Sequence, residues 1–311
     1  MPVITKEAAL DYHKMEGRPG KISVMPTKPL KSQLDLGLAY TPGVAYPVLE
    51  IDRDPEYAYD YTVKGNLVAV ISNGTAILGL GNRGALASKP VMEGKGVLFK
   101  AFADIDVFDI ELDTQDPDKL IEIVQAMAPT FGGINLEDIK APECFYIEAR
   151  LQELLDIPVF HDDQHGTAII LGAAVLNALE ITGKKKTDVK VVFSGAGAAG
   201  IACAQQLIQL GFPREHLWMV DINGLIYPGR SKDMPPKHAA LANGSGPQDL
   251  ANTLEGADIF IGLSAGDIVS QEMLKRMASD PIIFPMANPN PEIRYDLAVA
   301  ARPDAIVGTG R

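Results

Sequence analysis

The chain has 311 residues and a formal net charge of −12, and 47% of its residues are apolar. This length allows one large or two ordinary domains with a substantial core. Affinity for nucleic acid comes from phosphate neutralisation, so an acidic chain is a poor partner for it. The longest apolar run, Ala168 to Leu179, is too short to span a bilayer, and the N-terminus lacks the apolar segment of a signal peptide. We therefore expect a cytoplasmic protein that binds neither nucleic acid nor membranes.

The first half of the chain is punctuated by proline and glycine and mixes strand and helix patterns. Leu67–Ile71 reads as a buried strand, and Asp118–Ala128 has helical spacing that ends at Pro129. A short strand over Pro158–Phe160 leads into a helix over about Thr167–Leu179. These patterns predict a mixed α/β domain.

The second half alternates regularly between apolar strands and helical stretches. The expected strands are Val189–Phe193, Leu217–Val220, Ile259–Gly262, Ile282–Met286 and Ile306–Val307. This rhythm is typical of a Rossmann-type, doubly wound parallel sheet. We place the boundary near residue 164, which gives an α/β protein with a first domain over 1–164 and a second over 165–311.

The pattern G-x-G-x-x-G occurs twice, and the surroundings favour the second copy as a dinucleotide site. It follows the strand at 189–193 and opens an alanine-rich helix, Ala198–Leu210. Asp221 ends the next strand about 20 residues later, where an acid that binds the ribose is expected. The pyrophosphate would approach backbone N–H groups at the helix N-terminus. The expected cofactor-binding residues are Gly195, Gly197, Ala198, Ala199, Gly200 and Asp221.

The first copy, Gly79–Gly84, lacks this context. Pro90, Gly94 and Gly96 interrupt the segment behind it, so we expect a structural glycine loop with no helix after it.

The choice between NAD and NADP stays open at this point. Asp221 favours NAD, because a carboxylate repels a 2′-phosphate. Arg230 and Lys232 follow shortly after and could instead receive that phosphate.

Two acidic pairs stand near the ends of apolar segments. They are Glu137-Asp138 and Asp162-Asp163. A single pair of this kind is more often a solvated surface charge or a helix cap. Two pairs are better suited to a hard divalent cation with oxygen ligands, and spacing alone does not decide between these readings.

Five motifs, in order along the chain, resemble those of the malic enzyme family. They are YTPGVA at 40–45, GNLVAV at 65–70, LGLGN at 78–82, FGGINLEDI at 131–139 and FHDDQHGTA at 160–168. The resemblance runs from about Gly17 to Arg311 and is greatest to the short bacterial malic enzymes, including the malic-enzyme half of hybrids with phosphotransacetylase. It implies oxidative decarboxylation of L-malate to pyruvate with NAD or NADP and Mg²⁺ or Mn²⁺, oxaloacetate decarboxylation as a second activity, and a homodimer.

The resemblance also assigns roles to individual residues. Tyr40 matches the general acid that protonates the enol carbon, and Lys95 matches the general base for the substrate hydroxyl. Asp162 matches a carboxylate that tunes Lys95, and Asn288 matches an asparagine on the substrate or cofactor side. The matched metal ligands are Glu137, Asp138 and Asp163. Without the resemblance, Lys95 would be read as an exposed loop lysine and Tyr40 as a half-buried aromatic residue.

Two rival interpretations remain. Another two-domain dehydrogenase, such as an amino-acid dehydrogenase, would share the glycine loop but need no metal carboxylates. Because related enzymes continue beyond the position of Arg311, the chain could also be a truncated, non-catalytic module of a malic enzyme hybrid, with a dinucleotide-binding or regulatory role.

Overall fold

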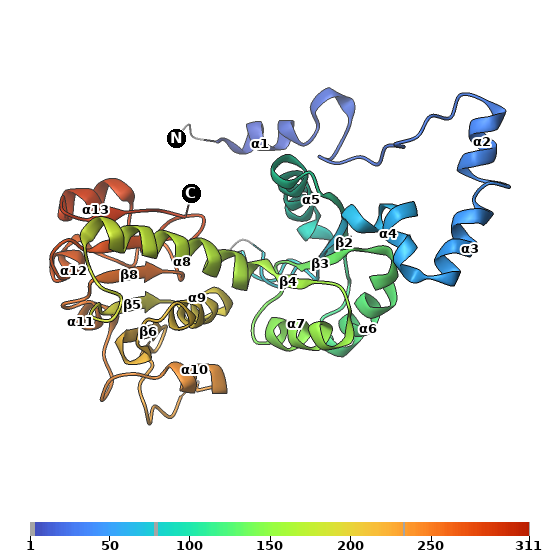
Figure 1. Ribbon diagram of the computed structural model, residues 1–311. Coiled ribbons are helices and arrows are strands. Elements are labelled where there is room, and N and C mark those ends of the chain that lie inside the picture. The colour runs from blue at the N-terminus through green and yellow to red at the C-terminus, as the bar shows by residue number, and fades with distance from the viewer. Residues whose placement is uncertain (1–3, 78–79, 233, 311) are drawn as a thin grey trace. The chain divides into compact units, whose positions relative to one another are not determined.

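The computed structural model describes residues 4–77, 80–232 and 234–310 and divides into two compact units. Each unit contains one β-sheet (Figure 1). Unit 1 comprises the segments up to 77, 82–139 and 146–160, and unit 2 comprises 78–81, 140–145 and the chain from 161 onwards.

The sheet of unit 1 has the strand order β2-β1-β3-β4. Its central strand, β1 (Leu67–Ser72), pairs in parallel with β2 (Asp106–Glu111) and β3 (Gly133–Leu136), and β4 (Val159–His161) lies beside β3. Five of the six residues of β1 are buried, as expected for a strand covered on both faces. The strand predicted at Leu67–Ile71 is therefore confirmed.

The other regular elements of the first half are helices. They are α1 (Lys6–Tyr12), α2 (Gln33–Ala39), α3 (Ala45–Arg53), α4 (Ala58–Tyr61), α5 (Ala85–Ala103), α6 (Pro117–Met127) and α7 (Glu143–Leu154), with 3₁₀ turns η1 (Met15–Gly17), η2 (Pro55–Tyr57), η3 (Val63–Asn66) and η4 (Ala128–Thr130). The Asp116 side chain caps α6 by accepting from the backbone N–H groups of Asp118 and Lys119. The helix expected up to Pro129 is confirmed.

The expectation that no helix follows the first glycine motif is wrong. Gly79 lies outside the described residues, but α5 begins directly after Gly84 and continues for 19 residues through Pro90. Gly96 has a packing reason, because a β-carbon there would lie 3.3 Å from Cγ1 of Val107 on β2. Close approach to the sheet thus offsets the low helix propensity of this segment.

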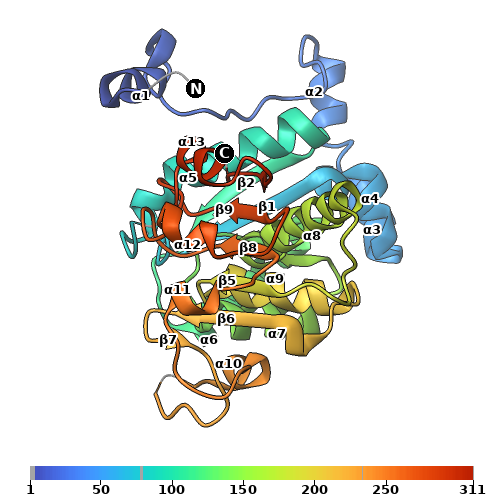
Figure 2. The ribbon, with the colours of Figure 1, turned by 90° about the vertical axis from the view of Figure 1, so that its left-hand side faces the viewer.

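Unit 2 contains the predicted doubly wound sheet, with the strand order β10-β9-β8-β5-β6-β7. Figure 2 labels its strands β5 to β9. The strands are β5 (Val191–Ser194), β6 (Leu217–Asp221), β7 (Gly224–Leu225), β8 (Ile259–Gly262), β9 (Ile282–Pro285) and β10 (Ile306–Val307). All pairings are parallel except that of β6 with β7. The helices are α8 (Asp162–Thr182), α9 (Ala198–Gln209), α10 (Pro236–Leu241), α11 (Leu250–Thr253), α12 (Gln271–Lys275) and α13 (Tyr295–Ala301), with a 3₁₀ turn η5 (Arg214–His216). This confirms the α/β fold class.

Helix α8 is longer than predicted, because it begins at Asp162 instead of Thr167. With 21 residues it is long and apolar enough to cross a membrane by length and composition, which the run of 168–179 was not. Part of its apolar surface is buried, since Leu171 and Val175 pack in the core that also contains Phe193. Such a buried stripe is what a helix covering a parallel sheet requires.

Candidate functional site

The second glycine motif connects β5 to α9, and its three glycines meet different surroundings. Gly195 has a φ of +111°, and a β-carbon there would lie 2.4 Å from the carbonyl oxygen of Leu263. A β-carbon on Gly200 would lie 2.1 Å from the carbonyl oxygen of Gly195. Gly197, by contrast, has no heavy atom of the described residues within 4 Å of its β-carbon position. The fold itself needs Gly195 and Gly200, whereas Gly197 leaves the space in which a pyrophosphate can approach Ala198 and Ala199 at the start of α9.

A carboxylate that sequence reasoning missed links two loops at this end of the sheet. Glu292 is fully buried and accepts hydrogen bonds from the backbone N–H groups of Ser264, at 2.8 Å, and Ala287, at 3.1 Å. These residues follow β8 and β9, and Ala287 precedes the exposed Asn288. No motif signals Glu292, because its role is visible only once the two loops are brought together.

The Asp221 carboxylate, at the end of β6, accepts hydrogen bonds from a backbone N–H group and from a guanidinium group. Its Oδ1 atom accepts from the backbone N–H of Asn223 at 2.7 Å and from Nη1 of Arg230 at 3.0 Å, and its Oδ2 atom accepts from Nη2 of Arg230. The Arg230 side chain is only 6% exposed. The acid predicted to bind the ribose is therefore neutralised by a buried cation.

In unit 1, two of the predicted site residues, to which the sequence assigned separate roles, lie together. Nζ of Lys95, on α5, lies 3.2 Å from Oε1 of Glu137. Glu137 is buried directly after β3, and its Oε2 atom accepts from the Asn135 side chain at 3.0 Å. The next residue, Asp138, is also buried and has a left-handed backbone with φ of 54°. The reading of Lys95 as an exposed loop residue is wrong, since it lies in a helix with a side chain 20% exposed.

Tyr40 differs from the expectation for a half-buried aromatic residue. It ends α2 as its C-cap and is 68% exposed. The sharp turn after it is specified by Gly43, whose β-carbon would lie 2.5 Å from the carbonyl oxygen of Gly37. The motif thus forms a tight turn that exposes the tyrosine ring.

The second acidic pair, Asp162 and Asp163, forms the first turn of α8. This turn directly follows β4, just as Glu137 directly follows β3. Both side chains are half-buried, and Oδ2 of Asp163 lies 3.9 Å from Nε2 of the fully buried His161. The pair therefore begins a helix, where carboxylates are also favoured by the helix dipole.

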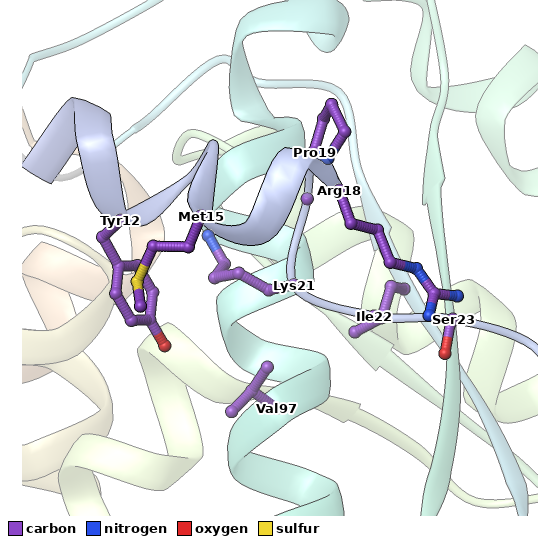
Figure 3. A pocket seen from close by; sticks show the side chains of 9 residues that line it. Tyr12, Met15, Arg18, Pro19, Lys21, Ile22, Ser23 and Val97 are labelled. Carbon is purple, nitrogen blue, oxygen red and sulfur yellow. The ribbon is translucent and has the colours of Figure 1, made fainter.

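A separate pocket of about 350 Å³ lies in unit 1 between the N-terminal segment and α5 (Figure 3). Tyr12 and Met15 lie side by side on one side of it, and Val97 reaches it from α5. None of the predicted site residues lines this pocket, although Lys95 precedes Val97 by two residues on the same helix.

Comparisons with known proteins agree on one family. The family described as "Malic enzyme, N-terminal domain" matches residues 19–152, and "Malic enzyme, NAD binding domain" matches residues 164–310. An NADP-dependent malic enzyme of Escherichia coli is 61% identical over 98% of this chain, and an NAD-dependent malic enzyme of Rhizobium meliloti is 58% identical over 98% of it. The chain spans 40% of the length of each of these relatives.

Solved structures give the same result. The crystal structure of an NAD-dependent malic enzyme from Thermotoga maritima is similar with a TM-score of 0.91 and 47% sequence identity, and the match covers 97% of this chain and 80% of that one. The two family domains occur in the expected order, and the structural match extends over both. The chain therefore belongs to the malic enzyme family.

Proposed function

We propose that the chain carries the substrate, metal and dinucleotide sites of an enzyme that converts L-malate to pyruvate and CO₂ with NAD⁺ or NADP⁺. The observation that carries the proposal is the pairing of Lys95 with the buried Glu137, within a chain of this family that also has the Gly195–Gly200 loop. Decarboxylation of oxaloacetate would be a second activity, because it uses the later part of the same reaction.

Glu137, Asp138 and Asp163 would hold Mg²⁺ or Mn²⁺. They offer only carboxylate oxygens, two of the side chains are buried and the third is half-buried, and they follow two strands that are neighbours in one sheet. Hard divalent cations prefer such ligands, and burial of several acids is costly without a compensating positive charge. A cation bound there would polarise the oxygens of the 2-hydroxy acid and of its oxidation product.

Lys95 would accept the proton of the C2 hydroxyl while hydride leaves C2 for the nicotinamide. Glu137 contributes position: it fixes Nζ of Lys95 at the end of β3, and the base itself would be the neutral amine. Asp162 would tune Lys95, Tyr40 would return a proton to C3 after CO₂ is lost, and Asn288 would contact the substrate or nicotinamide. The exposure of the Tyr40 ring suits a group that meets its partner only in the assembled enzyme.

The decisive experiment measures NAD(P)H formation from L-malate with Mn²⁺ and with excess EDTA, for this chain and for a chain extended to the length of its relatives. Metal-dependent activity in either supports the proposal. Full activity in excess EDTA would contradict the proposed metal dependence. Dinucleotide binding without turnover in both chains would favour a non-catalytic module. That second function is considered because the chain spans 40% of its relatives.

We also propose that the chain forms a homodimer through an N-terminal arm, defined as residues 33–53, which contains α2 and α3. Neither helix buries a single residue. Leu34, Leu38, Tyr46 and Leu49 are each more than 60% exposed. So many large apolar side chains in one short segment are typical of an interaction surface. A second copy of the chain is the occupant that the family resemblance implies.

A further inference from the structure

We propose that the dinucleotide site accepts the 2′-phosphate of NADP, with Lys232 as the residue that binds the phosphate and Arg230 as a positioning residue. The proposal rests on the proposed dinucleotide site at Gly195–Gly200. It assigns different tasks to the two cations that follow β6.

Arg230 is not the phosphate receptor, because its guanidinium group is already committed. It donates to both carboxylate oxygens of Asp221 and, more weakly, to the carbonyl oxygens of Gly224 at 3.3 Å and Leu225 at 3.4 Å. A buried bidentate pair of this kind is lost only at considerable cost. Arg230 therefore stays with Asp221.

The pairing changes what Asp221 does to a ligand. An unpaired carboxylate at the end of the second strand repels a 2′-phosphate and selects NAD. Beside a guanidinium group the net charge of the pair is close to zero, so this repulsion is largely removed. A carboxylate can accept about four hydrogen bonds, so Asp221 can still receive a ribose hydroxyl.

Lys232 supplies the positive charge that remains available. Nε of Arg230 donates to the carbonyl oxygen of Lys232 at 2.9 Å, which ties the backbone of Lys232 to the end of β6. The exposed ammonium group donates to Oδ1 of Asn223 at 3.2 Å, and the backbone N–H of Asn223 binds Asp221. The ammonium group is thus held next to the residue that would meet the ribose. An exposed lysine there can exchange an amide partner for a phosphate.

Isothermal titration calorimetry on the full chain tests the assignment with four probes: NADP⁺, NAD⁺, 2′,5′-ADP and 5′-ADP. Lys232→Met should lower the affinity for NADP⁺ and 2′,5′-ADP by about tenfold or more, which is the effect of losing one charged hydrogen bond. It should change the affinity for NAD⁺ and 5′-ADP by less than about twofold. Lys275→Met is the matched control, because Lys275 is 57% exposed on α12 and its one ion pair within the described part of the chain is with Glu272. It should leave all four affinities unchanged.

Arg230 is tested by rescue. Arg230→Met leaves the negative charge of Asp221 without its cation, and it should lower the affinity for NADP⁺ more than that for NAD⁺. Adding Asp221→Asn removes this charge and should restore part of the affinity for NADP⁺. A purely structural role would give equal losses and no rescue, and thermal melting verifies that each variant is folded. This assignment would be overturned if Lys232→Met lost affinity equally for both dinucleotides, or if the wild-type chain bound NAD⁺ but not NADP⁺. Either result would leave the proposed function intact. Failure of the wild-type chain to bind either dinucleotide would overturn both.

Discussion

The ammonium nitrogen of Lys95 lies 3.2 Å from a carboxylate oxygen of Glu137, and both side chains are largely buried. The pair joins α5 to the end of β3. A lysine held this way has a defined position before substrate arrives, which a general base needs.

Replacement of Lys95 by alanine should lower the rate of malate oxidation by about 10²–10⁴, the usual contribution of a general base. Metal-dependent decarboxylation of oxaloacetate should be affected less, because it requires no removal of a hydroxyl proton. Both rates are measured on an active chain, extended if necessary. Lys100→Ala is the control, since Lys100 lies on the same helix and, among the described residues, pairs with Asp104 and Asp106 alone. Small, equal losses in both reactions would leave Lys95 as a positioning residue.

Tyr40→Phe should give the complementary pattern. Removal of the hydroxyl group should slow ketonisation of enolpyruvate while partly sparing hydride transfer, because the role proposed for the tyrosine comes only after CO₂ is lost. Solvent proton incorporation at C3, followed by NMR, measures this step directly. Because Tyr40 is exposed, the substitution should not alter the unfolding midpoint. Unchanged ketonisation would assign the acid to another residue.

Gly197 and Gly200 should respond differently to substitution. Gly197→Val should fold, because its backbone is extended and its β-carbon would contact no atom of residues 4–77, 80–232 and 234–310. It should, however, lose NAD(P) binding. Gly200→Val should destabilise unit 2, because the new β-carbon would collide with the Gly195 carbonyl. Calorimetry and thermal melting of both variants separate the two effects. Unchanged affinity in a folded Gly197→Val chain would exclude this loop as the pyrophosphate site.

Glu111 on β2 should make unit 1 less stable as the pH rises. Burial, with a hydrogen bond to Asp109, raises the pKa of Glu111 to about 7. The folded chain then holds a proton that the unfolded chain releases above about pH 4.5, so the unfolding free energy falls between about pH 4.5 and 7. Glu111→Gln should flatten this slope in urea unfolding at pH 5 and 7. An unchanged slope would mean that other groups cause it.

The N-terminal arm can be tested by adding charge to it. Leu34→Glu combined with Leu38→Glu should convert a dimer to a monomer, because buried unpaired carboxylates are costly at an interface. Analytical ultracentrifugation measures the mass. Ile181→Glu is the control, since Ile181 is 76% exposed on α8, outside the arm. A monomeric wild-type chain, or dissociation by Ile181→Glu alone, would contradict the proposal.

The sequence predicted the second half of the fold better than the first for a physical reason. Strands such as Ile259–Gly262 are buried on both faces and appear as continuous apolar runs. Helix α5 was missed because Pro90 and Gly96 have low helix propensity. In the folded chain, close packing against Val107 leaves no room for a larger side chain at Gly96. The start of α8 was placed too late because its first turn is polar.

The candidate site was predictable only where residue type and order carry the information. The glycine loop and Asp221 follow from a pattern with a known spacing. The bidentate contact between Arg230 and Asp221 depends on how the loop after β6 folds back, which no spacing rule specifies. Glu292 depends on two loops meeting, so its position in the sequence gives no indication of its role.

The tight contact between Gly200 and the Gly195 carbonyl also limits how the chain can diversify. Since neither glycine tolerates a side chain, these two positions of the proposed pyrophosphate loop are closed to gradual adaptation. Under the proposed assignment, coenzyme preference can vary at the adenosine end, at exposed positions such as Lys232, where a substitution does not disturb the core. Enzyme engineers who wish to exchange one coenzyme for the other should accordingly randomise that loop and leave the glycine turn untouched.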